Sequence, residues 1–100
     1  LAPDLLIIPV PGHTKGHTVL LYNNQFLFSG DHLAWSERLN QLIAFHDACW
    51  YSWSALKQSM HKLANYSFEW VLPGHGRRYH ADAETMRYQM KRCVEWMEAN

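Results

Sequence analysis

The feature that most constrains this chain is a short loop with two histidines, Pro11-Gly12-His13-Thr14-Lys15-Gly16-His17. It separates two apolar runs, at residues 5–10 and 19–22. Proline fixes φ and lacks an N–H, and glycine allows positive φ, so the sequence predicts a tight loop between two strands. The two histidines also have the i, i+4 spacing of a helical zinc pair, but the proline and both glycines disfavour a helix here.

Composition indicates one globular domain without a strong electrostatic partner. The chain has 100 residues, of which 48% are hydrophobic, enough for a modest core. Nine basic residues balance nine acidic ones, so we expect no general attraction to nucleic acid or to an anionic membrane. No apolar run reaches the roughly 18 residues that a membrane span needs. We therefore expect no membrane partner.

The two cysteines point to a reducing compartment. Cys49 and Cys93 are far apart and form no Cys-x-x-Cys pair. We expect two free, mostly buried thiols and a cytoplasmic location. The sequence begins with Leu1 and carries no signal-peptide pattern, so we expect it to be a piece of a longer chain.

A hairpin brings distant residues together in the first part of the chain. We predict strands at residues 5–10, 18–22 and 25–29, with Pro9 at an edge or a strand end. Asn23 and Asn24 make the turn, because asparagine tolerates the left-handed conformation of tight hairpins. The third strand returns toward the first loop, so Asp31 is expected at the same end of the sheet as His13.

The second part of the chain is expected to add two long helices and a strand. Residues 32–52 lack a clear period, and we expect a short amphipathic helix within 36–45. Ser52 or Ser54 caps a predicted helix that runs to about residue 64. A strand follows at 68–72 and ends in Pro-Gly-His-Gly. Asp82 caps a final helix, 83 to about 98, whose predicted buried stripe is Met86, Met90, Cys93, Val94 and Met97.

Strand topology predicts a metal site. A strand–helix–strand unit within one sheet is normally parallel, so His75 is expected at the same sheet end as Asp31. His13, Asp31 and His75 then converge from three strand ends. Imidazole and carboxylate are suitable ligands for zinc, iron or manganese, and an aspartate between two histidines can bridge two ions.

These motifs, taken in order, resemble the C-terminal half of the metallo-β-lactamase superfamily, and most closely its glyoxalase II-like hydrolase branch. They are Pro-Gly-His-Thr-x-Gly-His after a strand, Gly-Asp after a hairpin, and Leu-Pro-Gly-His-Gly after a helix and a strand. Each motif is weak alone, but their order and spacing are specific. The resemblance implies an α/β fold: half of an αββα sandwich over residues 1–100, with a mixed sheet and helices on one face.

The resemblance also implies roles for single residues. His13 would complete a first metal site, Asp31 would bridge two ions, and His75 would belong to the second site. A metal-bound hydroxide would attack a thioester, ester or similar acyl bond of a small-molecule substrate. Two zinc ions are expected in the intact enzyme, with iron or manganese as alternatives. Thr14 and His17 would support the site, and Gly16 would permit close backbone approach.

The chain also departs from the family pattern. The His-x-His-x-Asp-His signature that supplies the family's other ligands is absent. We therefore expect the 100 residues alone to bind metal weakly or not at all, and to be inactive. We also expect an apolar sheet face to be left uncovered, through which the chain would self-associate.

The substrate pocket is less constrained by the sequence. His32, next to Asp31, and His46, in the irregular segment, are expected behind the metal ligands or along the pocket wall. Two other functions remain open: an oxygenase of the same fold with a single iron, and a non-catalytic binding or scaffold module. A nuclease is disfavoured because the chain lacks a basic stripe.

Overall fold

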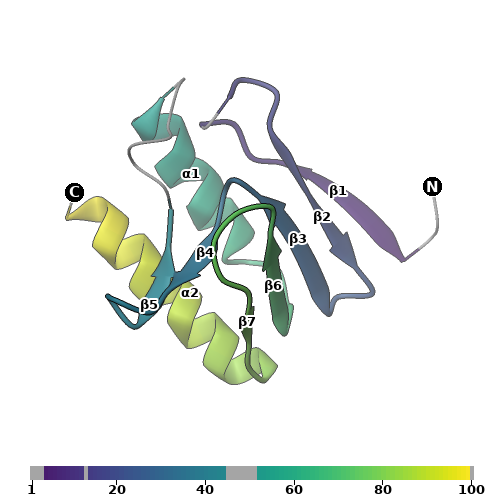
Figure 1. The fold of residues 1–100 in the computed structure, drawn as a ribbon. Coiled ribbons are helices and arrows are strands. Elements are labelled where there is room, and N and C mark those ends of the chain that lie inside the picture. The colour runs from purple at the N-terminus through teal and green to yellow at the C-terminus, as the bar shows by residue number, and fades with distance from the viewer. Residues whose placement is uncertain (1–3, 13, 45–51, 100) are drawn as a thin grey trace.

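The structure is a computed structural model that describes residues 4–12, 14–44 and 52–99. Figure 1 shows a mixed sheet, a separate two-stranded hairpin and two helices. The elements are, in chain order, β1 (Leu5–Pro9), β2 (Thr18–Tyr22), β3 (Phe26–Gly30), β4 (Ala34–Ser36), β5 (Gln41–Ile43), α1 (Trp53–Leu63), β6 (Trp70–Pro73), β7 (Tyr79–His80) and α2 (Ala83–Glu98).

The main sheet has the strand order β1-β2-β3-β6-β7. Strands β1, β2 and β3 form antiparallel pairs, and β6 runs parallel to β3, as the strand–helix–strand rule predicts. Asn23 and Asn24 make the predicted hairpin turn, with φ values of 57° and 51°. β1 is an edge strand that ends at Pro9, which removes an N–H where no further strand pairs.

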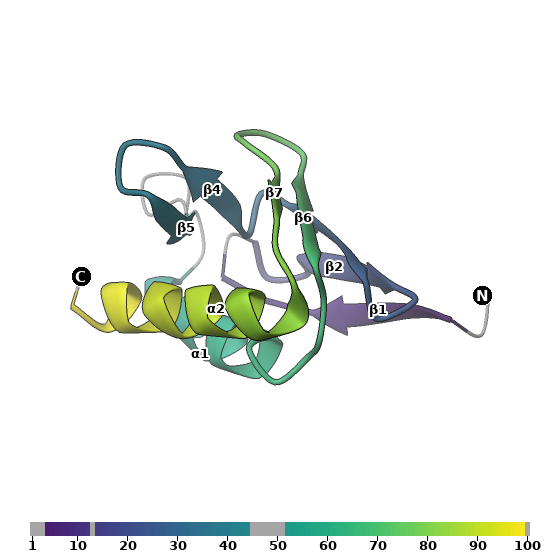
Figure 2. The ribbon, with the colours of Figure 1, turned by 90° about the horizontal axis from the view of Figure 1, so that it is seen from below.

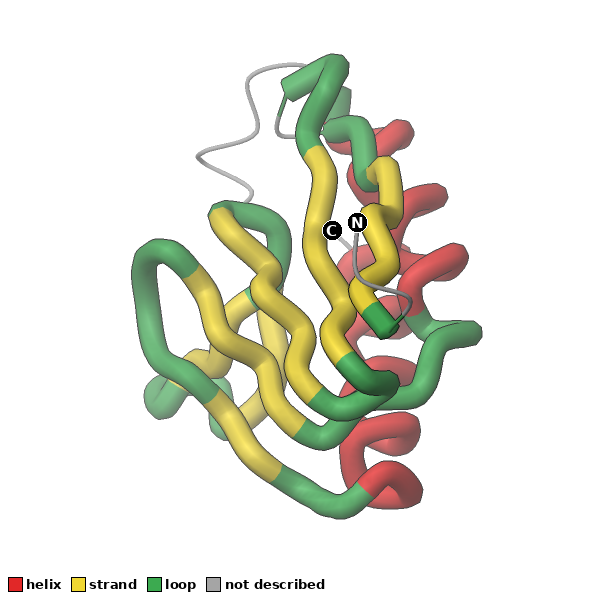
Figure 3. The backbone as a smooth tube through the Cα atoms, turned by 90° about the vertical axis from the view of Figure 1, so that its right-hand side faces the viewer, coloured by secondary structure: helices red, strands yellow, loops and turns green. Residues whose placement is uncertain are grey.

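Both helices cover one face of this sheet, as Figure 3 shows by the strands in front and the helices behind. Alternate residues of the strands point to this face, and most of them are buried. The buried apolar residues of the main sheet are Ile8, Val19, Leu21, Leu27 and Val71, and they share one core with Leu56, Met60 and Leu63 of α1 and with Met86, Met90, Cys93 and Met97 of α2. The predicted stripe of α2 is thus confirmed, except that Val94 is only partly buried.

Side chains cap both helices at the predicted residues. The Ser52 hydroxyl accepts a hydrogen bond from the Ala55 N–H (3.1 Å), and an Asp82 carboxylate oxygen accepts one from the Thr85 N–H (2.7 Å). This second bond is the main reason that the pKa of Asp82 is lowered. Neither helix of the described residues has the length and apolar character needed to cross a membrane.

The opposite face of the sheet is apolar and uncovered, as expected. Ile7, Leu20 and Phe28 are 44%, 36% and 45% exposed, and they lie side by side in the register of β1, β2 and β3. Leu72 of β6 continues this row. A second row on the same face contains aromatic rings: Tyr22 lies beside Phe26, Phe26 stacks on Trp70, and Trp70 stacks on His80. We call these two rows the outer face.

The prediction of a helix within residues 36–45 is wrong for the residues of this range that the structure describes. Residues 34–43 instead form the β4–β5 hairpin, which Figure 2 shows beside the β6–β7 pair. Asn40 has φ 53°, which breaks any helix at this point. Leu42 is buried, and β5 packs against α2, so tertiary contacts decide the local conformation.

Two smaller differences concern the end of the sheet. β6 begins at Trp70, two residues later than predicted, and Phe68 packs into the core ahead of it. β7 was not predicted, because Tyr79–His80 is only two residues long. It pairs with β6 and returns the chain from the end of β6 to the start of α2.

Candidate functional site

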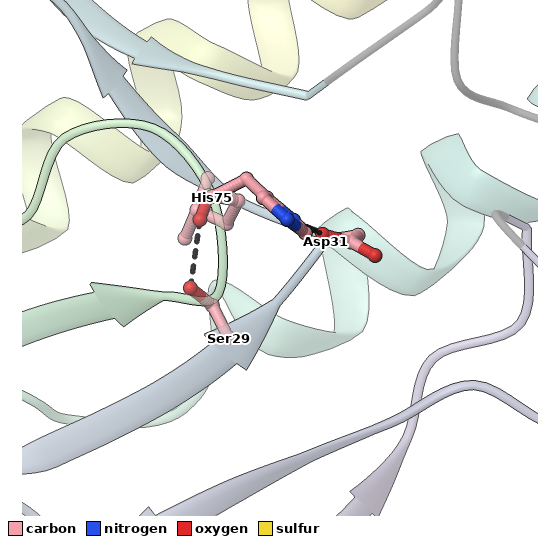
Figure 4. Close-up of polar contacts among 4 residues, drawn as sticks. Ser29, Asp31 and His75 are labelled. Atoms are coloured by element: carbon pink, nitrogen blue, oxygen red, sulfur yellow. Dashed lines mark hydrogen bonds and ion pairs between the residues drawn. The ribbon is translucent and has the colours of Figure 1, made fainter.

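Asp31 and His75 meet at one end of the sheet, although 44 positions separate them in the sequence. Asp31 follows β3 and His75 follows β6 by two residues, and the two strands are parallel neighbours. His75 Nδ1 and Asp31 Oδ1 lie 2.8 Å apart, so Nδ1 donates a hydrogen bond when it carries the proton. Figure 4 shows the imidazole directed at the carboxylate. The predicted meeting of these two residues is confirmed, and we call this edge the rim.

The backbone fixes both residues of the pair. Gly30 ends β3 with φ 56°, a conformation that glycine adopts without steric cost. Its carbonyl accepts a hydrogen bond from the Gly74 N–H (2.9 Å), which ties the loop that carries His75 to the strand that carries Asp31. The distance between the two side chains therefore depends on strand pairing rather than on a flexible loop.

Ser29 is a positioning residue that sequence reasoning missed. Its side chain is completely buried, and its hydroxyl donates a hydrogen bond to the Leu33 carbonyl (2.7 Å; Figure 4). The Ser29 carbonyl accepts from the His32 N–H (2.9 Å) in the same turn. Both bonds span Asp31 and hold its backbone. The signal in the sequence was a hydroxyl at an inward-facing strand position.

His17 and His32 lie next to the rim rather than on its surface. Their ring centroids are 6.2 Å apart. His32 is fully buried, so it does not present its ring to a substrate. The His17 ring lies against Gly30, where a Cβ would stand 3.1 Å from its nearest atom. Gly30 thus provides both an unusual φ and room for an imidazole beside Asp31.

The first loop is held against α1. Ser59 donates a hydrogen bond to the Pro11 carbonyl (2.7 Å), and the Gly12 carbonyl accepts one from the Ser52 N–H (3.0 Å). Residues 14–17 form turns and not a helix, so this part of the loop is not the helix that a helical zinc pair would need. Thr14 is exposed. His13 and His46 lie outside the described residues, so their predicted roles stay predictions.

Close backbone approach occurs at Gly12 and not at Gly16. A Cβ on Gly16 would meet no atom of the described residues within 4 Å, so these residues do not explain the glycine by close approach. A Cβ on Gly12 would lie 2.5 Å from the Leu56 Cα, and the φ of Gly12 is 148°. The first turn of α1 leaves no space there, a tertiary contact that the loop sequence alone does not reveal.

The Asp31–His75 pair offers suitable donors for a divalent ion. A carboxylate and an imidazole are ligands that zinc, iron and manganese accept. The His75 side chain is 85% exposed and that of Asp31 38%, so both are open to solvent at the rim. Within residues 4–12, 14–44 and 52–99, no three His, Cys, Asp or Glu side chains form a group that could hold a metal ion.

Comparisons with known proteins add no relative. The sequence matches no protein-family model, and no curated protein is significantly similar to it. The metallo-β-lactamase resemblance therefore depends on the motifs themselves, and the function has to be argued from the rim.

Proposed function

We propose that this chain is the C-terminal half of a metal-dependent hydrolase that cleaves a thioester, ester or similar acyl bond in a small molecule. The observation that carries the proposal is the Asp31–His75 pair, 2.8 Å apart at a strand-end rim. The order of the three motifs along the chain adds the metallo-β-lactamase resemblance. Strand ends are suitable for catalysis because they hold loop residues on a rigid support.

In this proposal His13, Asp31 and His75 hold zinc, with iron or manganese as alternatives. Bound ions would supply an activated water and polarise the acyl carbonyl. Asp31 is suited to the bridging position because its two oxygens can face two ions. Its contact with His75 and the turn held by Ser29 would keep the carboxylate in one orientation.

Zinc titration of the chain by calorimetry tests the site. We expect weak binding, because three ligands divided between two ions hold each ion poorly. Changes outside the ligand set already cost about 10–100-fold in metal affinity, so Asp31→Asn should weaken binding by at least about tenfold. Asp82→Asn is the matched control, because asparagine still caps α2. Equal zinc affinity in all three proteins would contradict the site.

The reaction is tested on a protein that carries these residues together with a His-x-His-x-Asp-His segment. Loaded with two zinc equivalents, it should hydrolyse a thioester, and Asp31→Asn should lower kcat by roughly two orders of magnitude. One redox-active iron per chain would favour the oxygenase instead. Absence of metal from the purified protein and of hydrolysis would favour a binding or scaffold module.

We also propose that the outer face joins two copies of the chain. The first row of this face, which contains Ile7, Leu20, Phe28 and Leu72, has no charged side chain. The net charge of the chain is zero. Copies therefore do not repel each other, and a flat apolar face can pack on its own two-fold copy. Sheets pack face to face in this way at about 10 Å.

Light scattering over a range of protein concentrations measures this association. The unmodified chain should form dimers, and Phe28→Lys should shift it to monomers, because a charge would be buried in the interface. Tyr88→Lys is the control, since Tyr88 is an exposed aromatic residue on α2, away from the outer face. A monomer at every concentration would contradict the proposal.

The cytoplasm is the compartment that we propose. Cys93 is a free thiol in the core, where burial raises its pKa to about 12. A thiol that is neither oxidised nor exposed suits a reducing environment. Cys49 lies outside the described residues.

A further inference from the structure

The loop that carries His75 also carries a second polar feature, which the proposed metal site does not use. The loop between β6 and β7 extends past the ends of both strands (Figure 2). It borders a hollow of about 630 Å³, lined by Leu72, Pro73, Gly76, Arg77 and Arg78. The lining residues flank Gly74 and His75 in the chain, so the hollow and the imidazole belong to the same loop.

The two arginines of this hollow differ in their charge environment. Arg77 forms an ion pair with Glu37, with 2.7 Å between Nη2 and Oε1. Within the described part of the chain, no carboxylate forms an ion pair with Arg78. The hollow therefore contains one compensated guanidinium and one that is available to an anion.

The loop presents Arg78 from a fixed backbone. The Arg77 carbonyl accepts a hydrogen bond from the Trp35 N–H (2.9 Å), which joins the loop to β4. Next to Arg78, the Tyr79 ring stacks on Trp35 with 4.1 Å between centroids and 4° between planes. At its other end the loop is tied to β3 by the bond from Gly74 to Gly30. Fixing the backbone reduces the entropy that a ligand must remove on binding.

We propose that Arg78 binds an oxyanion of the substrate, a carboxylate or a phosphate, while the acyl group lies at the rim. This assignment to a substrate rests on the proposed function. A guanidinium suits such a ligand because its planar N–H donors match two oxygens at once. The substrate class thus narrows to acyl compounds with an anionic group a short distance from the scissile bond.

Amide chemical shifts measured by NMR on the full chain test this site. Inorganic phosphate and acetate are titrated separately, at constant ionic strength and with EDTA present. We expect the Gly76 amide shift to saturate with at least one anion. Arg78→Gln should weaken that anion about tenfold, because a hydrogen bond to a charged group is lost, and Arg78→Lys should restore part of the affinity. Arg87→Gln on α2 is the control and should leave it unchanged.

The two titrations also identify the chemical group. Saturation with phosphate alone assigns a phosphoryl group, with acetate alone a carboxylate, and either result supports the proposal. A shift that never saturates, or one that saturates equally in Arg78→Gln, would overturn it.

Because EDTA removes metal, this result is independent of the zinc titration. Equal zinc affinity of the unmodified chain and of Asp31→Asn, together with intact phosphate or acetate binding, would contradict the metal site and leave an anion site. The reverse result would remove only the role of Arg78.

Discussion

The chain contains the tripeptide Pro-Gly-His twice, at residues 11–13 and 73–75, and the two loops are held in different ways. Each follows a strand of the same sheet. The first loop is fixed by packing and hydrogen bonds to α1 and its cap, whereas the second is fixed by backbone hydrogen bonds to neighbouring strands. The same tripeptide is therefore needed for different physical reasons in the two loops.

In the first loop, the requirement is space. Gly12 lies directly on Leu56, and the carbonyls of Pro9 and Pro11 accept hydrogen bonds from Lys62 Nζ and Ser59 Oγ. Three successive turns of α1 thus contact one short segment. Any side chain larger than hydrogen at Gly12 has to displace the helix or the loop.

In the second loop, glycine is required so that the backbone can reverse its direction. Gly76 has φ 87°, which permits the reversal between β6 and β7. Gly74 has ordinary van der Waals room, with its nearest neighbour at 3.7 Å from a built Cβ. A glycine that precedes a candidate ligand is thus required by packing in the first loop, whereas the second loop has room for a side chain at the same position.

The largest effect is expected for Gly12→Ala. A Cβ at 2.5 Å from the Leu56 Cα and a φ of 148° combine overpacking with backbone strain. We expect a loss of about 2–4 kcal/mol in the free energy of unfolding. For a domain of this size, that lowers the melting temperature by roughly 10 °C or more. Thermal unfolding followed by circular dichroism measures it.

Gly16→Ala is the control for this substitution, in the same loop. A Cβ there meets open space, so we expect a change within about 1 kcal/mol, with a gain if the unfolded chain loses entropy. Equal losses of stability at positions 12 and 16 would show that the whole loop requires glycine. Contact with Leu56 would then not be the reason for Gly12.

Most of the fold could be predicted because periodicity and caps are local. The strands at β1, β2 and β3 and the caps Ser52 and Asp82 are read from short windows, and the parallel pairing of β3 with β6 follows from chirality. That chirality placed Asp31 beside His75. This part of the site was therefore available from the sequence as a topological argument.

The remaining features depend on contacts between distant segments. The β4–β5 hairpin is set by packing on α2, and Leu39, Leu42 and Ile43 have the spacing of a helix face without forming one. Ser29 stabilises the turn at Asp31, and Gly30 leaves room for the His17 ring. No local sequence pattern predicts either role. The sequence also could not distinguish Gly12 from Gly16, because the difference is the presence of α1.

A smaller effect is expected for Ser59→Ala, which removes one bond between α1 and the first loop. The Ser59 side chain is almost fully buried, and its loss leaves the Pro11 carbonyl without that donor. We expect a cost of about 1–2 kcal/mol, measured by urea unfolding. Ser54→Ala, on an exposed position of the same helix, should be neutral or slightly stabilising. A neutral Ser59→Ala would show that this hydrogen bond does not stabilise the loop.

The smallest effect is expected for Gly74→Ala, in the second loop. Its φ is not in the left-handed region, and an added Cβ would make only ordinary contacts with Gly30. We expect stability to change by less than about 1 kcal/mol. Gly30→Ala is the matched comparison across the hydrogen bond that joins them, because its φ of 56° and the His17 ring at 3.1 Å both oppose a side chain. Urea unfolding should rank Gly30→Ala as clearly the more destabilising, at about 1–3 kcal/mol. A larger loss at Gly74 would mean that the second loop is also limited by packing, and the two Pro-Gly-His loops would then share one mechanism.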